Sequence, residues 1–189
     1  MNSLRPDHVI INAVLRGDTM QYNELVLRHM DYAYSIALKI VHNAMDAEEI
    51  AHDAFLKAYK SLRKFNQKAK FTTWLYRIVF NTAISHTRKN HLQADDINEI
   101  TTQPESGSDS SDPLMNQDRQ RFLTVAMRKL SPIDSGLITM FYLDQLSLLE
   151  IGEVIDIKPD LIKVKLFRAR KRLAKELEIL LEGEVKEII

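Results

Sequence analysis

Apolar residues recur every three or four positions along most of this 189-residue chain, which is the period of an amphipathic α-helix. The period predicts eight helices, over residues 7–16, 19–43, 46–65, 71–90, 114–130, 132–143, 147–155 and 159–181. Alternation of apolar and polar residues between turn signals, which is typical of strands, is absent, and the chain has only five glycines and five prolines. The pattern therefore predicts an all-α protein.

Helix start signals support these boundaries. A side chain that caps the first turn, or a proline at the first helical position, marks where a helix begins. Such signals stand at Asp7, at Asp46 with Glu49, at Ser131-Pro132, at Ser147 with Glu150, and at Pro159. Asp46 with Glu49 and Ser147 with Glu150 have the spacing of a capping box, in which each side chain forms a hydrogen bond with the other residue's backbone N–H.

A polar and acidic stretch divides the helices into two groups. Residues 103–113 read Gln-Pro-Glu-Ser-Gly-Ser-Asp-Ser-Ser-Asp-Pro, which is rich in helix breakers and too poor in apolar residues to form a core. We therefore expect two small helical domains, residues 1–92 and residues 117–189, joined by a flexible acidic linker over residues 93–116.

The charges are segregated, although the formal net charge is zero. Residues 1–92 carry 13 Lys and Arg against 8 Asp and Glu, residues 93–118 carry none against 7, and residues 119–189 carry 13 against 11. Two basic blocks on either side of an acidic strip predict two surfaces for a polyanion.

Several classes of protein are disfavoured by composition. The chain has no cysteine, which excludes disulfides, thiolate catalysis and cysteine-based zinc sites. No apolar run approaches eighteen residues, so we expect no membrane insertion. The first six residues lack the basic start and apolar stretch of a signal peptide, and we therefore expect a cytoplasmic protein.

The strongest local pattern is the pair of helices around Asp156. A short capped helix, a three-residue break and a second helix rich in cations have the order of a helix-turn-helix, whose second helix enters the major groove of DNA. Glycine often supplies the left-handed conformation in such a turn, and Asp tolerates that conformation better than most residues. Six apolar residues are expected to hold the two helices together: Ile151, Val154, Ile155, Ile157, Ile162 and Leu166.

The second helix of this pair supplies candidate DNA-binding residues. Those near its start would face the base edges: Asp160, Leu161, Lys163, Lys165 and Arg168. Three cations further along would meet phosphates: Arg170, Lys171 and Arg172. The alternative is an amphipathic helix whose Lys and Arg side chains only face solvent.

A second pattern covers residues 66–89, where aromatic and cationic residues interleave. Phe71, Trp74, Tyr76 and Phe80 alternate with Lys68, Lys70, Arg77, Arg88 and Lys89. Exposed aromatic rings beside cations can stack unpaired bases while the cations hold the backbone. The alternative is that aromatic residues at this spacing belong to the core, where we expect Trp74 in any case.

These segments, in this order, carry a family resemblance. Residues 46–65 (Asp-Ala-Glu-Glu-Ile-Ala-His-Asp-Ala-Phe-Leu-Lys-Ala-Tyr-Lys-Ser-Leu-Arg-Lys-Phe) and 71–78 (Phe-Thr-Thr-Trp-Leu-Tyr-Arg-Ile) with Asn81 resemble conserved region 2 of the bacterial sigma factors. Residues 147–155 and 164–173 resemble region 4. No room remains for regions 1.1 or 3, which is the anatomy of the small extracytoplasmic-function group.

The resemblance implies a subunit that directs RNA polymerase to promoters rather than an enzyme, without a cofactor or metal. It implies core polymerase (the β′ clamp helices and the β subunit), promoter DNA and an anti-sigma factor as partners. The implied docking residues are Glu49, His52, Asp53 and Lys57. The implied −10 residues are Asn66, Lys68, Lys70, Arg77, Asn81, Ser85, Arg88 and Lys89, and the −35 residues are those of the second helix above.

Departures from the family's pattern affect the promoter sequence rather than the general role. Phe80, Thr82 and residues 159–161 differ from the residues that the family more often has. The acidic linker either follows the basic RNA path of the polymerase, as the resemblance implies, or is a solvated tether.

Two other functions are compatible with parts of the chain. Glu49 and His52 have the Glu-x-x-His spacing of di-iron bundles, but that chemistry needs a second copy and two further glutamates, and no second copy occurs. The other possibility is an operator-binding regulator, in which residues 1–92 sense a ligand and only the C-terminal domain binds DNA.

Overall fold

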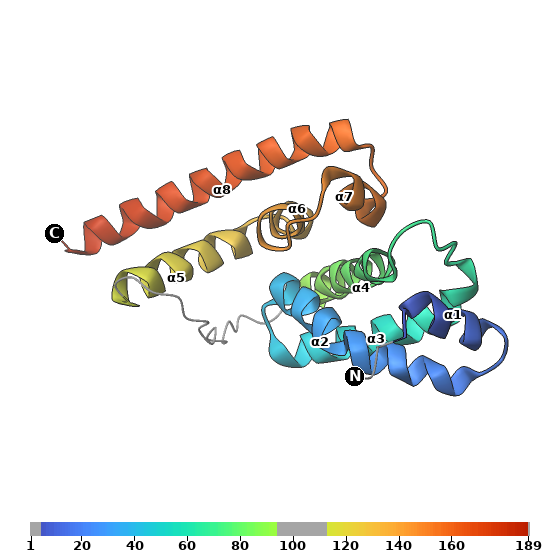
Figure 1. The fold of residues 1–189 in the computed structure, drawn as a ribbon. Coiled ribbons are helices and arrows are strands. Elements are labelled where there is room, and N and C mark those ends of the chain that lie inside the picture. Colours follow the sequence, from blue (N-terminus) through green and yellow to red (C-terminus); the bar gives the residue numbers. More distant parts are fainter. Residues whose placement is uncertain (1–4, 94–112, 189) are drawn as a thin grey trace. The chain divides into compact units, whose positions relative to one another are not determined.

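A computed structural model describes residues 5–93 and 113–188 of the chain, and these residues are helical, with turns and no strands (Figure 1). The described residues divide into two compact units, one built mainly from residues 5–93 and the other mainly from residues 113–188. The predicted all-α fold class is therefore confirmed. The predicted acidic linker, residues 93–116, lies largely outside the described residues, and its last four residues belong to a helix that begins at Pro113.

The first unit consists of four helices: α1 (Asp7–Leu15), α2 (Tyr22–Val41), α3 (Ala44–Ser61) and α4 (Phe71–Gln93). One turn of 3₁₀ helix precedes α2 (Thr19–Gln21) and another follows α3 (Leu62–Lys64). Helices α2, α3 and α4 pack against one another (Figure 1). Their shared core includes Leu25, Ile36, Ile50, Leu75 and Val79, all of which are buried.

The cap of α3 lies three residues before the predicted one. Asn43 has an extended backbone, and its side-chain oxygen accepts a hydrogen bond from the Asp46 backbone N–H at 3.1 Å. The chain leaves α2 through a left-handed residue, His42, whose φ is 54°. The prediction that Asp46 caps this helix is therefore wrong. Asp46 lies in the first turn instead, where its negative charge stabilises the helix by interacting with the positive end of the helix dipole.

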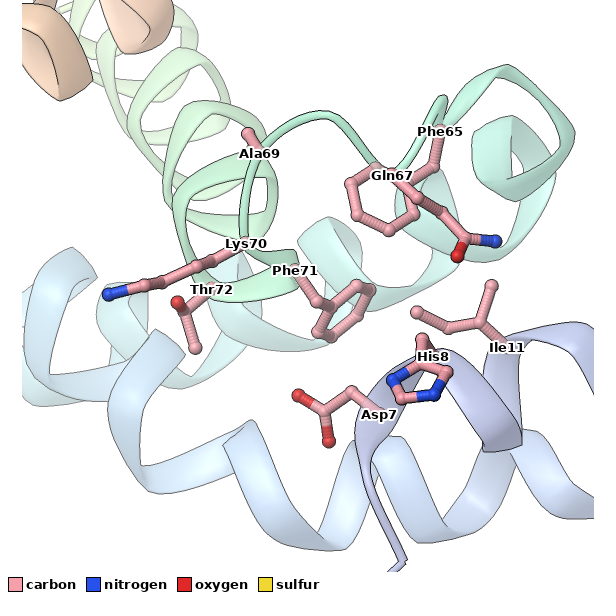
Figure 2. A pocket seen from close by; sticks show the side chains of 9 residues that line it. All are labelled: Asp7, His8, Ile11, Phe65, Gln67, Ala69, Lys70, Phe71 and Thr72. Atoms are coloured by element: carbon pink, nitrogen blue, oxygen red, sulfur yellow. The ribbon is translucent and has the colours of Figure 1, made fainter.

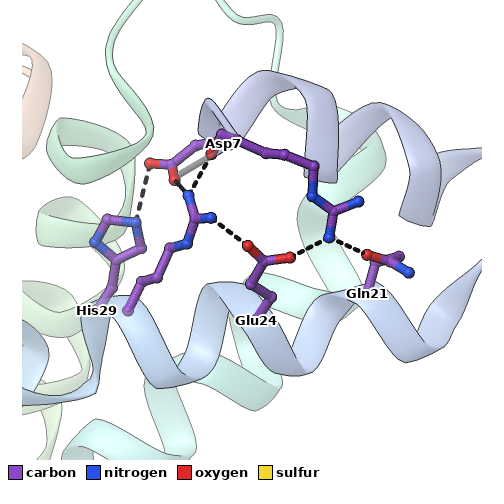
Figure 3. Close-up of polar contacts among 6 residues, drawn as sticks. Asp7, Gln21, Glu24 and His29 are labelled. Carbon is purple, nitrogen blue, oxygen red and sulfur yellow. Dashed lines mark hydrogen bonds and ion pairs between the residues drawn. The ribbon is translucent and has the colours of Figure 1, made fainter. Parts of the chain in front are cut away.

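Asp7 is likewise a first-turn residue rather than a cap, because α1 begins at Asp7 itself and no side chain caps it. The Asp7 carboxylate faces α2 instead, with Oδ2 at 2.9 Å from Nε2 of His29 and Oδ1 at 3.4 Å from Nη1 of Arg28 (Figure 3). These contacts attach the start of α1 to the middle of α2.

Arg5 extends this attachment along α2. Its guanidinium donates to Gln21 Oε1 at 2.8 Å and pairs with Glu24, which also pairs with Arg28 (Figure 3). Desolvation would raise the pKa of the Glu24 carboxyl, but the hydrogen bond from Arg5 and the charges of Arg5 and Arg28 outweigh it and hold that pKa below its usual value. Helix α1 is thus held by these charge pairs in addition to its buried apolar side, which consists of Ile10, Ile11 and Val14.

The second unit contains α5 (Pro113–Lys129), α6 (Pro132–Ile138), α7 (Leu148–Ile155) and α8 (Pro159–Ile188). Helix α8 packs against α5 and α6, and the core between them includes Met127, Leu130, Ile138 and Ala169. The predicted start of α6 is confirmed, because Ser131 Oγ accepts from the Asp134 backbone N–H at 3.2 Å and Pro132 takes the first position. Residues Thr139–Leu143 continue α6 as a π-helical turn.

The predicted capping box at the start of α7 is also confirmed. Ser147 Oγ accepts from the Glu150 backbone N–H at 3.2 Å, and the Ser147 backbone N–H donates to Glu150 Oε2 at 3.0 Å. Both hydrogen bonds join two residues that are three positions apart, so this cap can be predicted from the local sequence alone.

The turn between α7 and α8 depends on two residues. Asp156 adopts the left-handed conformation with φ of 57°, as predicted, and so redirects the chain. Gly152 allows a close approach, because a Cβ atom there would lie 2.8 Å from the carbonyl oxygen of Ile157 and 3.5 Å from Cδ1 of Ile162. Ile157 closes the turn by donating its backbone N–H to the Gly152 carbonyl at 3.2 Å.

Replacing Gly152 with alanine is therefore expected to loosen the α7–α8 pair. Alanine gains about 1 kcal/mol of helix propensity, but overpacking against a backbone oxygen costs about 1–3 kcal/mol. Hydrogen exchange of the full chain should show faster exchange in α7 and the start of α8 for Gly152→Ala and no change for Glu153→Ala, which alters an exposed neighbour. Equal or slower exchange in Gly152→Ala would contradict the close approach.

Candidate nucleic-acid interface

The loop between α3 and α4 is held from two sides. Asn66 accepts a hydrogen bond from the Lys68 backbone N–H at 3.1 Å, and Gln67 adopts a left-handed conformation with φ of 57°. The Gln67 amide then donates to Oδ1 of Asn12, on α1, at 2.9 Å. Helix α1 and the loop are therefore joined, although 55 residues separate the two side chains.

A pocket of about 530 Å³ opens between α1 and this loop (Figure 2). The rings of Phe65 and Phe71 and the side chain of Ile11 give it an apolar side, and polar side chains surround the remainder. Its lining residues are Asp7, His8, Ile11, Phe65, Gln67, Ala69, Lys70, Phe71 and Thr72. An apolar wall with a few polar groups is typical of pockets that bind small ligands.

The predicted −10 residues lie around this pocket and along α4. Asn66, Lys68 and Lys70 are exposed on the loop. Five more are exposed along α4: Arg77, Asn81, Ser85, Arg88 and Lys89. Four of these five recur at helical spacing and so share a face, and the Ser85 hydroxyl donates to the Asn81 carbonyl at 2.8 Å.

The aromatic residues of α4 do not form the exposed stacking surface considered from the sequence. Phe71, Tyr76 and Phe80 are buried, because α4 packs against both α2 and α3 and most of its apolar surface faces them. Trp74 is only partly buried, contrary to the expectation that it belongs to the core. Its ring centroid lies 5.0 Å from that of Phe65 and 5.8 Å from that of Phe71, beside the pocket.

The predicted docking residues lie on the outer side of α3. Glu49, His52 and Asp53 are exposed. Lys57 is also exposed, but its ammonium group donates to the Thr82 hydroxyl on α4 at 3.2 Å. The four residues therefore share one face of α3, but the Lys57 side chain also takes part in the contact between α3 and α4.

Sequence reasoning did not find the apolar groove beside this face. A second pocket, of about 730 Å³, lies between α2 and α3 and includes His52, Leu56 and Tyr59 in its lining. Leu56 is 60% exposed. Tyr22 also lines it, with a hydroxyl that donates to the Phe55 carbonyl at 2.7 Å, and burial raises the pKa of that hydroxyl. The available signal was the presence of Leu56 and Tyr59 outside the buried stripe of α3.

All eight predicted −35 residues are exposed on α8, but three have partners within their own unit. Arg172 pairs with the buried carboxylate of Asp134 on α6 at 2.5 Å. Arg170 donates to the Tyr142 hydroxyl at 3.1 Å, and the Lys171 ammonium lies 5.1 Å above the ring centroid of Phe167. The phosphate role predicted for these three residues stays a prediction, and Arg172 in addition attaches α8 to α6.

The interior of the helix pair follows the predicted pattern in most positions. Ile151, Val154, Ile162 and Leu166 are buried, whereas Ile155 and Ile157 are partly buried. Two further apolar residues, Val164 and Phe167, are exposed beside the cations of α8.

No group of three or more histidine, aspartate or glutamate side chains within residues 5–93 and 113–188 could hold a metal ion. Glu49 and His52 stand exposed on α3 without the further carboxylates that a di-iron site needs. In the same described ranges, no helix is both long and apolar enough to cross a membrane.

Comparison with known families gives two matches in the order expected from the motifs. Residues 25–92 match Sigma-70 region 2, and residues 123–173 match Sigma-70 region 4. The first match runs from the first turn of α2 nearly to the end of α4, and the second runs from the end of α5 through α6 and α7 to the middle of α8.

Relatives match along almost their whole length. The chain is 30% identical to the ECF RNA polymerase sigma factor SigW of Bacillus subtilis, over 88% of this chain and 94% of that protein. It is 31% identical to the ECF RNA polymerase sigma-E factor of Escherichia coli K12, over 96% of this chain and 99% of that protein.

Solved structures share the fold at lower identity. The sigma factor RpoE of Bartonella quintana, solved with the anti-sigma factor NepR, superposes with a TM-score of 0.65 at 19% identity, over 84% of this chain and 97% of that one. CnrH, solved with the cytosolic domain of CnrY, gives 0.64 at 18% identity, over 92% and 97%. From the two region matches and these full-length relatives, the chain belongs to the extracytoplasmic-function sigma factors of bacterial RNA polymerase.

Proposed function

We propose that this sigma factor divides promoter recognition between its two helical units, and that α3 docks them on core polymerase. The sigma family directs RNA polymerase to promoters by binding the core enzyme and promoter DNA. The observation that carries the division here is the presence of two cationic surfaces with different geometry. One adjoins a pocket beside α1, and the other lies on the second helix of a helix-turn-helix.

The pocket beside the loop supports a role for the first unit in capturing an unpaired base of the −10 element. Its apolar wall, built from Ile11, Phe65 and Phe71, suits a base that has left the duplex, because such a base has lost its stacking and an apolar surface offsets part of that loss. Lys68 and Lys70 stand exposed beside it and would hold the strand's phosphates. The exposed face of α4, from Arg77 to Arg88, would continue along the melted strand.

The α7–α8 pair supports duplex recognition at the −35 element by the second unit. Gly152 and the left-handed Asp156 bring the start of α8 close to α7, as a major-groove reader requires. Lys163, Lys165 and Arg168 are exposed on the first turns of α8, where base edges and phosphates would lie.

The distance between the two elements is compatible with one chain. Promoter boxes more than one helical turn apart are separated by above ~34 Å. The 19 residues between Gln93, the end of α4, and Pro113, the start of α5, could span roughly 65 Å if fully extended. We accordingly assign residues 1–92 to core docking, −10 recognition and melting, residues 93–116 to the linker, and residues 117–189 to −35 recognition. An operator-binding regulator would instead bind duplex DNA tightly without core polymerase.

Further assignments follow from the family. Sigma factors are transcription initiation factors without enzymatic activity, and we propose the same for this chain, acting in the cytoplasm without a cofactor. Its partners would be core polymerase, through the β′ clamp helices and the β subunit, promoter DNA, and an inhibitor of the anti-sigma type. The complex of RpoE with NepR is the observation that favours such an inhibitor.

Reversing the charge of Asp53 tests the docking face. Asp53 is exposed on α3, so Asp53→Arg should leave the fold intact. Exposed Glu49 and Asp53 give the docking face negative charge, so its complement on core polymerase should be basic. An arginine at position 53 would then bring like charges together, which costs several kcal/mol, and we expect the affinity for core polymerase to fall at least about tenfold. Asp31→Arg makes the same change on an exposed position of α2 and should retain full affinity. Unchanged binding of Asp53→Arg to core would place the docking face elsewhere.

Arginine truncation on α8 tests the duplex-reading face. Arg168→Ala should weaken −35 binding by the holoenzyme about five- to hundredfold, the range for one base contact, without changing core affinity. If Arg168 binds a phosphate instead, the loss will be uniform across sequences and the salt slope will decrease by about one. Arg172→Ala should mainly destabilise the second unit, because Arg172 pairs with Asp134. Equal loss of core and −35 binding in Arg168→Ala would argue against separate surfaces.

A further inference from the structure

Two apolar side chains project from the outward side of α8 in its first two turns. Leu161 is 55% exposed and Val164 is 48% exposed. They lie three residues apart, so they are neighbours on one face of the helix. The opposite stripe of the same helix is buried and consists of Ile162, Leu166 and Ala169. Leu161 and Val164 therefore lie outside the buried core of their own unit, and we refer to them as the apolar pair.

The apolar pair differs from the third exposed apolar residue of this face. Phe167 is 50% exposed, but the Lys171 ammonium lies over its ring, 5.1 Å from the ring centroid. The apolar pair has no such cover, and Arg168 follows Val164 by one helical turn on the same face. The start of α8 thus presents an apolar spot next to a guanidinium.

The surroundings of the apolar pair identify its counterpart. Lys158, Lys163, Lys165 and Arg168 are all exposed around it, and Asp160 is the one acidic residue between Lys158 and Lys175. Such a surface is complementary to a polyanion. Within the major groove of DNA, the only apolar group that a base edge offers is the 5-methyl group of thymine, and phosphates flank it on both sides. An apolar spot ringed by cations matches that arrangement.

We propose that Leu161 and Val164 contact thymine methyl groups in the −35 element and so determine part of its sequence. This proposal rests on the function proposed above, in which the start of α8 enters the major groove. It adds that at least one base pair is specified by an apolar contact, while the neighbouring cations hold phosphates and guanine edges.

The test removes the methyl group alone. Core polymerase with the full chain first selects active promoters from a library randomised over both elements. The selected −35 duplex is then synthesised with deoxyuridine in place of each thymidine in turn, because deoxyuridine differs from thymidine only by the missing methyl. Holoenzyme affinity is measured for each duplex with the wild-type chain, with Leu161→Ala, with Val164→Ala, and with Ile179→Ala. Ile179 is 53% exposed further along α8 and serves as the matched control.

The expected result is a loss of about fourfold in affinity for each contacted methyl group, the factor that corresponds to burying one such group. The loss should occur with the wild-type chain and with Ile179→Ala. In at least one of the variants Leu161→Ala and Val164→Ala, deoxyuridine should no longer lower the affinity, because the side chain that contacts the methyl group is missing. If the two side chains contact different thymines, each variant should lose the effect at its own thymine. All four proteins should bind core polymerase equally.

Three outcomes would overturn the proposal while leaving the proposed function in place. The selected −35 sequence could contain no thymine on either strand, or deoxyuridine could leave wild-type affinity unchanged at every position. Leu161→Ala could also lower core affinity and keep the thymidine preference, which would assign the apolar pair to a protein contact. If the wild-type chain selects no −35 sequence at all, the proposed function fails and this inference fails with it.

Discussion

Burial of one stripe along each long helix determines what that helix can present to nucleic acid. In α8 the buried side chains are Ile162, Leu166 and Ala169. Ile162 lies beside Gly152 of α7, and Ala169 packs with Met127 and Leu130 of α5 and Ile138 of α6. The remaining side chains of its first three turns then face away from that core. The same constraint acts on α4, where burial of Leu75, Val79 and neighbouring residues leaves the face from Arg77 to Arg88 exposed. The chemistry available to DNA is therefore a consequence of packing.

The two units meet this constraint with different supporting contacts. In the first unit, charge pairs attach α1 to α2, and the bond between Asn12 and Gln67 attaches the loop to α1, so that a pocket forms between them. In the second unit, the glycine at 152 brings α7 against the start of α8, and the Arg172–Asp134 pair attaches α8 to α6. A pocket suits a base that has left the duplex, whereas a projecting helix suits an intact groove.

Features that arise within a few residues could be predicted from the sequence. The Ser131 cap, the Ser147–Glu150 box and the left-handed Asp156 involve neighbours in the chain, and the structure has all three. The cap of α3 was misplaced because Asn43 and Asp46 can both cap, and the choice depends on where α2 ends.

Features that depend on distant residues were missed. Two such contacts join residues far apart in the sequence, Asn12 with Gln67 across 55 residues and Arg172 with Asp134 across 38. No local sequence pattern predicts either contact. The burial of Tyr76 and Phe80 was also not decided by their spacing, because it requires that α2 and α3 both cover α4.

The division of labour between the two units is tested most directly by probing a promoter in complex with core polymerase and this chain. Permanganate, which oxidises unpaired thymines, should react from the −10 element downstream to the start site and not at −35, while hydroxyl-radical protection should cover duplex DNA at the −35 region. Both signals should require core polymerase and the full chain together. A chain that protects duplex DNA without core polymerase, or a complex with protection at −35 and no unpaired thymine at −10, would contradict this account.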